Sequence, residues 1–513
     1  MRIGLIVALA KVPRWIGELL DRIAASGRHE VGLVPSPHQV APAKEAASAA
    51  LDRLLALERM RAGRHRNWLI DDMGKRAAIA SLPHLPNGPP LGLLLDLSGE
   101  NTRLGTPPSV RTLTPLLDGV PLAAGLWPAL LSRRAPAISV HDSANGEILT
   151  LALPALQAPH RLLESADAVL SHLVRCLADA ALAVTSTGML PRFASTPSPS
   201  HVAAPGAMSL ASTASFLAAR IAAAITVRGQ RLLKQDPVWQ VAWRYAPTRL
   251  DAPQPLDASV YRRIRDDGRR YYADPFLFEH QGSLHLFVEE LPSSNGRGII
   301  SHVAFGSDGP HGSLTPVLTE PHHLSYPQVF ARDGQIWMLP EAAQSGRLTL
   351  YRAAPFPSRW VPHATLISEP LHDATLFEHD GRLWITTATV IGTASSWDTL
   401  SIWSAEQLEG PWSPHPANPV LVDARAARPA GVPYVSDGVL WRLAQDCRDG
   451  YGAALSLCRV TELSPTRFAQ EIVETYRFGS APSTSGPHTI NHTSGIEVVD
   501  LFAPRSFRVH AKS

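Results

Sequence analysis

The spacing of hydrophobic and polar positions changes along the chain, and the change near residue 271 separates two regions. In the first 190 residues, short apolar runs alternate with stretches whose apolar positions recur every three or four residues. The apolar runs predict strands and the recurring stretches predict helices. The expected strands are 3–10, 29–35, 91–98 and 146–156, and the expected helices are 14–26, 43–61 and 166–183. This alternation favours a Rossmann-like α/β domain with a mainly parallel sheet.

The first apolar run has a second interpretation as a short signal peptide, because it follows Arg2 and ends on Ala-Leu-Ala. We favour a buried strand, since the run is at the lower length limit for a signal. It also leads into a helix that carries Trp15, Leu19 and Ile23 on one face.

A segment rich in Pro, Ser and Ala, 190–207, predicts a linker, and 208–235 then predicts a helix with apolar and basic positions. That helix either contacts a membrane surface or, the interpretation we favour, packs between two domains. No segment has the roughly 20 uninterrupted apolar residues of a membrane span. The expected domains are 1–190, a connection at 191–235, and 236–513.

From Tyr271 onward, runs of aromatic and β-branched residues separated by glycine turns predict β-strands, and one hairpin pattern repeats. The turn glycines Gly282, Gly334, Gly381 and Gly438 stand 52, 47 and 57 residues apart, and an aromatic residue precedes each by four. A weaker fifth unit spans 488–502. Hairpins that recur about every 50 residues predict the blades of a propeller. We therefore expect an all-β, five-bladed β-propeller over 236–513.

The same register places acidic and polar residues at the blade entrances. Eight residues before the glycines stand Asp274, Tyr326 and Asp373, and seven after them stand Glu289, Glu341 and Gln445. Because both sets end one hairpin, we expect Asp274 beside Glu289 and Tyr326 beside Glu341, all at one mouth. The further candidates for ligand binding are Arg428, Asp446 and His492.

Carboxylates that converge on a site rich in Trp and Tyr are what glycosidic bond chemistry requires, because one acid protonates the leaving oxygen and another acts as base or nucleophile. Acidic residues next to turn glycines, such as Asp333, Asp380 and Asp437, more often only cap hairpins. A glutamate after an apolar strand is harder to explain that way, since buried carboxylates are costly. Histidines near the entrances fit no standard ligand spacing, so we expect no metal and no cofactor.

Composition narrows the possible partners and the compartment. A net charge of +2 does not provide the excess of basic residues typical of nucleic-acid-binding proteins. A hydrophobic content of 45% excludes a disordered chain. Three cysteines form neither a disulfide framework nor a CxxC pair, which favours a reducing compartment and a cytoplasmic protein.

Several segments resemble a known family in order along the chain. HLSYPQVFARDGQIWMLPEAAQSGRLTLYRAAPFP, DATLFEHDGRLWI, GPWSPHPANPV and LWRLAQDCRDGYG resemble the N-terminal domain of plant glucosamine inositolphosphorylceramide transferases and their bacterial relatives, over about 236–500. That domain looks like the five-bladed propellers of arabinanases, xylosidases and fructan-active enzymes. The resemblance implies Asp274 as base or nucleophile, Glu341 as acid and Asp373 as a modulator of the pKa of that acid. Those hydrolases usually place the acid at the start of a blade, whereas Glu341 follows a second strand.

The N-terminal region resembles a divergent formyltransferase domain through LGLLLDLSGEN, GLWPALLSRRAPAISVHDSANGEILT and SADAVLSHLVRCLADA. That family acts through an Asn, a His and an Asp. Asn101 and the pair His141-Asp142 are the nearest matches, but no HPSLLP-like loop follows Asn101, which favours a degenerate, structural domain.

Three functions follow from these observations. The first is a protein of envelope polysaccharide or glycolipid biosynthesis whose propeller binds a glycan, glycolipid or nucleotide sugar and cleaves or transfers a glycosyl unit. The second is a formyl- or acyl-type transferase that acts on an amino or nucleotide sugar. The third is a glycan-binding scaffold without catalysis.

Overall fold

A computed structural model describes thirteen stretches of the chain, which fall into two compact units. The described residues are 2–6, 13–27, 29–34, 46–62, 66, 68–71, 91–97, 110–186, 208–232, 237–246, 257–294, 296–478 and 486–504. One unit comprises Met1–Ile225 with Val390–Ser395, and the other comprises Thr226–Thr389 with Ser396–Ser513. The linker predicted at 190–207 lies outside the described residues.

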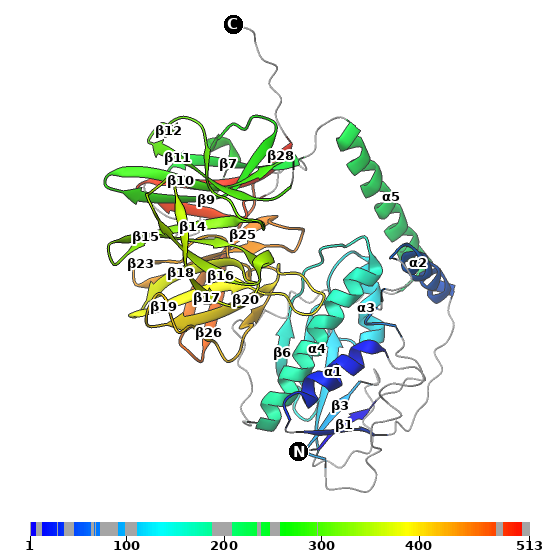
Figure 1. The fold of residues 1–513 in the computed structure, drawn as a ribbon. Helices are drawn as coiled ribbons and strands as arrows, with labels where there is room; N and C mark the ends of the chain where they lie inside the picture. The colour runs from blue at the N-terminus through cyan, green and yellow to red at the C-terminus, as the bar shows by residue number, and fades with distance from the viewer. Residues whose placement is uncertain are drawn as a thin grey trace. The chain divides into compact units, whose positions relative to one another are not determined.

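The N-terminal unit is an α/β layer built on a six-stranded mixed sheet with the order β2-β1-β3-β4-β5-β6 (Figure 1). Pairings among the first four strands of this order are parallel, and β5 and β6 continue the sheet antiparallel. The strands are β1 (Arg2–Ile6), β2 (Glu30–Val34), β3 (Leu93–Asp96), β4 (Arg111–Leu117), β5 (Ile138–Asp142) and β6 (Ile148–Ala152). The mainly parallel sheet predicted from the apolar runs is confirmed, and the described part of the first run, Ile3–Ile6, lies in a buried strand.

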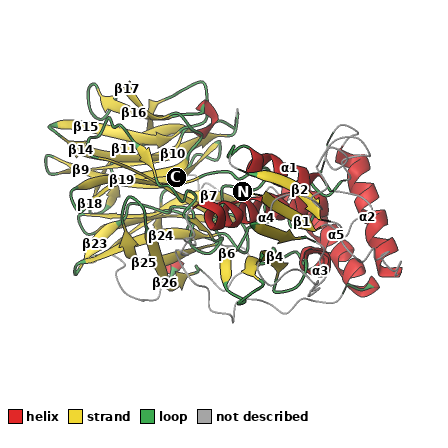
Figure 2. Cartoon of the chain, turned by 90° about the horizontal axis from the view of Figure 1, so that it is seen from below, coloured by secondary structure: helices red, strands yellow, loops and turns green. Residues whose placement is uncertain are grey.

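Three helices, α1 (Arg14–Ala24), α3 (Leu122–Leu131) and α4 (Leu162–Ser186), pack on this sheet (Figure 2). The helix α2 (Ala46–Ala62) packs on α4, and a further helix, α5 (Leu210–Leu232), follows in the chain. The face of α1 that carries Trp15, Leu19 and Ile23 is buried, as predicted. The sequence pattern did not reveal β4 or α3, because Pro115 and Pro128 interrupt their apolar runs.

The second unit is a β-propeller of five sheets with four or five strands each. Blade one is β9 (Arg270–His280), β10 (Ser283–Pro292), β11 (Ile299–Gly306), β12 (Gly309–Pro310) and β13 (Thr315–Leu318). Blade two is β14 (Ser325–Arg332), β15 (Gln335–Glu341), β16 (Leu348–Ala353) and β17 (Trp360–Ile367). Blade three is β18 (His372–His379), β19 (Arg382–Ala388), β20 (Thr399–Ala405), β21 (Ser413–Pro414) and β22 (Leu421–Val422). Blade four is β23 (Tyr434–Ser436), β24 (Val439–Asp446), β25 (Ala454–Leu463) and β26 (Phe468–Tyr476).

Blade five joins the two ends of the propeller and closes the ring. Its inner strands β27 (Ile490–Thr493) and β28 (Ile496–Pro504) come from the end of the chain. Its outer strands β7 (Pro237–Tyr245) and β8 (Arg262–Arg263) precede blade one, and β28 pairs with β7 along nine residues. The fifth blade is confirmed, and its signal in the sequence is weak because only half of its strands follow the repeat.

The inner hairpin of every blade turns through two residues with positive φ. The glycines have φ between 71° and 75°, and the residues before them have φ between 48° and 52°. These values fit a type I′ turn, whose twist matches that of paired strands. The pairs are Gln281-Gly282, Asp333-Gly334, Asp380-Gly381, Asp437-Gly438 and Ser494-Gly495.

Three inner strands carry a β-bulge at equivalent positions near the start of the blade. Two residues of the inner strand oppose one residue of its partner after Ala273, after Ser325 and after His372. The first bulged residue is Asp274, Tyr326 or Asp373, with φ of 49°, 48° and 50°. Non-glycine residues seldom adopt this conformation, and bulges of this kind re-aim side chains next to functional sites.

The bulges shift the strand register beside the predicted site residues Glu289 and Glu341. The direct cross-strand partners of Glu289 and Glu341 are Ala273 and Ser325, not Asp274 and Tyr326. The extra residue at each bulge shifts the register by one.

The pairing of β7 with β28 closes the propeller, so buried side chains of β7 are expected to contribute to the free energy of unfolding. Trp243 is 4% exposed and packs edge-to-face on Phe305 of blade one, whereas Tyr245 on the same strand is 70% exposed. Trp243→Ala is expected to lower the free energy of unfolding by about 3–5 kcal/mol, and Tyr245→Ala by less than about 0.5 kcal/mol, measured by denaturant unfolding. Equal effects of the two variants would contradict a closing role for β7.

Candidate functional site

A histidine held between two aspartates lies where blade five meets blade one. His488 Nε2 is 3.2 Å from Asp274 Oδ1, and His488 Nδ1 is 2.8 Å from Asp500 Oδ2. All three side chains are buried. Burial disfavours the charged ring, but Asp500 and Asp274 raise the pKa of His488 to about 10. The ring is therefore held as an imidazolium that is ion-paired with both carboxylates.

The same three residues are close enough to hold a metal ion, since their ligand atoms lie within 4.8 Å of one another. A metal requires an imidazole nitrogen with a free lone pair. The raised pKa of His488 favours the imidazolium, in which neither ring nitrogen has a free lone pair, so the arrangement fits an ion-pair chain better than a metal centre.

Asp274 is anchored on every side. Its backbone N–H donates to Asp500 Oδ2 at 3.0 Å, and its carboxylate accepts from Thr489 Oγ1 at 2.6 Å and from the Tyr326 N–H at 3.3 Å. Burial opposes ionisation, but His488 and Thr489 lower the pKa of Asp274 below its ordinary value. Asp274 is therefore a carboxylate whose accepting positions are largely occupied.

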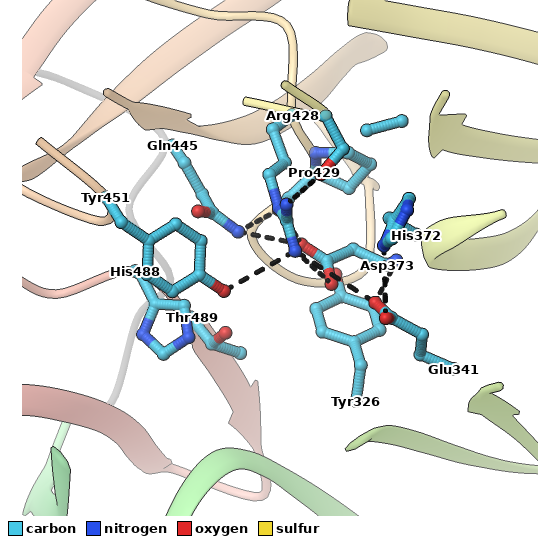
Figure 3. Close-up of polar contacts among 12 residues, drawn as sticks. Tyr326, Glu341, His372, Asp373, Arg428, Pro429, Gln445, Tyr451, His488 and Thr489 are labelled. Carbon is cyan, nitrogen blue, oxygen red and sulfur yellow. Dashed lines mark hydrogen bonds and ion pairs between the residues drawn. The ribbon is translucent and has the colours of Figure 1, made fainter. Parts of the chain in front are cut away.

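A second cluster is centred on the ion pair of Asp373 with Arg428 (Figure 3). Arg428 Nε and Nη2 lie 2.6 and 3.2 Å from the two carboxylate oxygens of Asp373, and Gln445 Nε2 donates to Asp373 Oδ2 at 2.8 Å. Arg428 Nη1 also donates to Ser396 Oγ at 2.6 Å. Burial opposes the cation, but Asp373 raises the pKa of Arg428 well above its usual range. The pair is bidentate and fixes the plane of the guanidinium.

Glu341 connects this cluster to blade two. Its Oε2 accepts from the Asp373 N–H at 2.9 Å, and its Oε1 lies 3.2 Å from His372 Nδ1. Burial disfavours ionisation, yet His372 and then Arg428 lower the pKa of Glu341 to about 2. Glu341 is thus ionised across the physiological pH range.

Tyr326 connects blade two with residues of other blades. Its hydroxyl oxygen accepts from the Gly431 N–H at 2.6 Å and lies 3.0 Å from Thr375 Oγ1, and its ring packs on Phe276. The fully buried phenol therefore braces three blades beneath the charged residues instead of presenting a free hydroxyl to a ligand.

The pKa of Glu289 is raised, in contrast to those of Asp274 and Glu341, which are lowered. Burial raises its pKa and the charge of Asp274 raises it further, while His323 Nε2, 3.1 Å from Glu289 Oε1, offsets part of the effect. In turn, Glu289 raises the pKa of His323 against the effect of burial. Within the described residues, the contacts of Glu289 include neither an arginine nor a backbone N–H, unlike those of Asp274, Glu341 and Asp373.

Three half-buried aromatic rings lie beside these charges. The ring centroids of Trp239 and Trp397 are 6.0 and 5.5 Å from that of Tyr451, and Trp239 lies 3.9 Å from His488. The Arg428 guanidinium carbon is 5.0 Å from the centre of the Tyr451 ring. The hairpin register missed all three rings, because Trp239 precedes the first repeat and the others lie in loops.

The structure brings together most of the predicted residues but not all of them. Asp274, Tyr326, Glu341, Asp373, Arg428 and Gln445 belong to the connected clusters. Asp446 instead accepts from Arg448 and Arg477, because successive residues of a strand point to opposite faces.

His492 lies near the turn end of blade five. Its Nε2 is 2.6 Å from the Ala246 carbonyl oxygen, and its side chain lines a mostly apolar cavity of about 290 Å³ with Phe278, Phe330 and Tyr434. These residues stand next to the hairpin turns, so the cavity is at the opposite end of the inner strands from Asp274 and Asp373. The site of interest is therefore not this cavity. It is the charged mouth, which is formed by Asp274, Glu289, Glu341, Asp373, Arg428 and Gln445.

The formyltransferase residues do not form a site in the described part of the N-terminal unit. Asn101 lies outside the described residues. His141 Nε2 is 2.9 Å from Ser139 Oγ, and Asp142 accepts from Arg111 Nε at 2.7 Å and from the Ala144 N–H at 3.0 Å. Asp142 is engaged in holding a strand end.

Comparison with known sequences identifies relatives of the propeller. Residues 261–490 match the family described as glucosamine inositolphosphorylceramide transferase 1, N-terminal. The glucosamine inositolphosphorylceramide transferase 1 of Arabidopsis thaliana is 33% identical over 204 residues, and that of Oryza sativa subsp. japonica is 33% identical over 205. Each match covers 39% of this chain and 27% of the relative, so the chain spans about a quarter of the length of the curated relatives it matches.

Solved structures with a loose likeness are glycoside hydrolases. An exo-β-1,3-galactanase of Clostridium thermocellum has a TM-score of 0.31 and 12% identity over 42% of this chain and 54% of its own. A family 117 glycoside hydrolase of Zobellia galactanivorans has a TM-score of 0.34 and 11% identity over 52% of this chain and 91% of its own. At these scores no residue correspondence is drawn.

The ion-pair chain predicts how stability depends on pH. The pKa of His488 in the folded protein, about 10, lies above its ordinary value of 6.5. The stability that protonation contributes is therefore complete below pH 6.5 and is lost as pH rises towards 10. His488→Gln is expected to melt well below the wild type at pH 6.5, and the difference in Tm should narrow steadily by pH 10.

The control for this prediction is His311→Gln, at an imidazole whose side chain is 59% exposed. It should leave Tm close to that of the wild type at every pH. A His488→Gln difference that does not change with pH would show that the ring is neutral in the folded protein.

Proposed function

We propose that the charged mouth of the propeller binds a glycan, glycolipid or nucleotide sugar in the biosynthesis of an envelope polysaccharide or glycolipid. The observation that carries this proposal is the bidentate Arg428–Asp373 pair with Gln445, set beside the rings of Trp239, Trp397 and Tyr451. Sugar hydroxyls donate to carboxylates and accept from amides and guanidinium groups. Aromatic rings supply apolar faces against which the C–H face of a sugar packs.

Binding is better supported than cleavage for the residues that resemblance marked as catalytic. An acid that protonates a leaving oxygen needs a raised pKa, but that of Glu341 is lowered to about 2. A base or nucleophile needs a free lone pair, and Asp274 already uses three of its roughly four accepting positions on Thr489, His488 and the Tyr326 N–H. The roles of Glu341 as acid and Asp274 as base stay predictions, and the low pKa of Glu341 counts against the first of them.

If the mouth transfers or cleaves a glycosyl unit, Glu289 is the better acid. Its pKa is raised by burial and by Asp274, whereas the pKa of Asp274 is lowered. Two neighbouring carboxyl groups with pKa values moved apart are the usual basis for dividing acid and base roles. Asp373 then acts through Arg428 and the Glu341 carboxylate, not by contact with the leaving group.

The sequence relatives support the class of ligand. They are named for glucosamine and inositolphosphorylceramide, so amino sugars and sugar-bearing lipids are the first ligands to test. The cytoplasmic location stays a proposal that the three free, buried cysteines support. A formyl- or acyl-transferase role of the N-terminal unit has support only from its α/β sheet, and folate binding to the full chain would revive it.

Ligand binding is tested with the full-length protein against a panel of amino sugars, oligosaccharides and nucleotide sugars, by titration calorimetry. Trp397→Ala is expected to weaken the binding of any hit about tenfold or more, equivalent to about 1.4 kcal/mol. Tyr245→Ala, an exposed ring beside the turn glycine Gly495, should leave the affinity unchanged. Equal affinities of both variants would place the ligand elsewhere.

Catalysis is tested by comparing Glu289→Gln with Glu341→Gln on any substrate that is turned over. Glu289→Gln should lower kcat at least 100-fold with the affinity retained, within the range that general acids contribute. The activity of the wild type should fall as pH rises through the raised pKa of Glu289. Full activity of Glu289→Gln combined with loss of activity in Glu341→Gln would return the acid role to Glu341.

A further inference from the structure

The helix α5 carries a stripe of large apolar side chains on its open surface. Leu210–Gln230 has the length and mean hydropathy, 1.6, of a membrane-crossing helix, but only 11% of it is buried. The helix α4 passes the same test but is 67% buried, as expected of a core helix. Val227, 46% exposed, lies outside the stripe. The other five exposed apolar residues follow spacings of seven, four, four and seven, which place them on one side of a helix. They are Leu210, Leu217, Ile221, Ile225 and Leu232, with exposed fractions from 42% to 78%.

A second side of α5 is fastened to the N-terminal unit. Phe216 and Thr213 are buried, and Arg220 Nη1 donates to Glu58 Oε1 of α2 at 2.7 Å. Glu58 is itself buried, and its Oε2 accepts from the Leu163 N–H at the start of α4 at 2.9 Å. Accordingly α2 lies against the N-terminal part of α5 in two views (Figure 1, Figure 2).

This ion pair decides between crossing a membrane and lying on it. Arg220 stands midway along the apolar segment, where a spanning helix would place it at the centre of the bilayer. Reaching that position would break its contact with Glu58 and leave both groups without their partner in an apolar medium. The geometry is that of a helix that keeps one side on the protein and offers the other to an interface.

The charge of α5 indicates which surface it meets. The segment Leu210–Leu232 contains three arginines and neither Asp nor Glu. Arg228 is exposed and shares the apolar stripe near its C-terminal end, where a long cationic side chain can reach lipid phosphates while its stem stays among acyl chains. On α2, two apolar residues close to Glu58 in the sequence, Leu57 and Met60, are also exposed, at 49% and 72%.

We propose that the stripe of Leu210, Leu217, Ile221, Ile225 and Leu232 docks the protein on the surface of an anionic lipid bilayer, with α5 lying in the plane of the membrane. The apolar side chains enter the region between headgroups and acyl chains. Arg228 contacts the phosphate groups. This docking is independent of the sugar site and does not require that site to be catalytic.

The test is sedimentation of the full-length protein with vesicles of phosphatidylcholine alone or with phosphatidylglycerol added. The wild type is expected to bind the anionic vesicles at least tenfold more tightly than the neutral ones, and alkaline carbonate should release it. Leu217→Glu combined with Ile221→Glu and Ile225→Glu should lower the binding at least tenfold without a change in Tm. Arg228→Glu should remove most of the preference for anionic vesicles.

The matched control is Val260→Glu combined with Val435→Glu, at two propeller side chains that are 53% and 55% exposed, and it should bind as the wild type does. Three outcomes would overturn the proposal. They are absence of wild-type binding to either vesicle, unchanged binding of the triple variant, and resistance of the bound protein to carbonate, which would indicate a spanning helix. A dimeric wild type without vesicle binding, and a monomeric triple variant, would assign the stripe to a second copy of the chain.

Discussion

The fully buried carboxylate of Asp500 joins the last blade of the propeller to the first. It lies on β28, which pairs with the closing strand β7. It accepts hydrogen bonds from the backbone N–H groups of Asp274, His488 and Thr489, and it is ion-paired with the ring of His488. A propeller has no stable open form, because each blade covers its faces with its neighbours. The hydrogen bonds that complete this ring are therefore the same ones that hold Asp274 at the mouth, and closure of the fold and assembly of the site are one event.

The other charged residues of the mouth are also held by contacts between blades. Each of them interacts with a residue from a neighbouring blade. The Asp373 of blade three is held by Arg428 and Gln445 near blade four and donates its backbone N–H to Glu341 of blade two. Buried ion pairs contribute little net stability, but breaking one leaves a costly unpaired charge. Such a network is rigid before any ligand arrives, so little conformational entropy is lost on binding. The arrangement suits a ligand with many hydroxyls better than one with a single charge.

The propeller could be predicted from the sequence because each hairpin follows local turn and strand patterns. The site could not be predicted in the same way, because it depends on irregularities in those strands. Asp-Gly pairs set the turns, and the fixed distances from Gly282, Gly334 and Gly381 place Asp274, Tyr326 and Asp373 at equivalent positions. The bulges that re-aim these residues add one residue to a strand and leave no mark in the apolar pattern. Asp446 shows the consequence of period two, since it follows the site residue Gln445 and points the other way. Trp239 and Tyr451 could not be assigned because no local pattern relates them to the repeat.

The location of the proton is what separates a sugar-binding mouth from a catalytic one. The cationic His488 and the Thr489 hydroxyl stabilise the charged form of Asp274, and burial without a strong donor favours the neutral form of Glu289. The pair thus has the asymmetry that acid–base catalysis requires. Three of the roughly four accepting positions of the Asp274 carboxylate are occupied by Thr489 Oγ1, the Tyr326 N–H and His488 Nε2. A ligand hydroxyl that reached the remaining position, or that displaced Thr489, would meet an anionic oxygen with a protonated neighbour beside it. Transfer chemistry at this mouth therefore depends on whether the bound sugar reaches the Asp274 carboxylate.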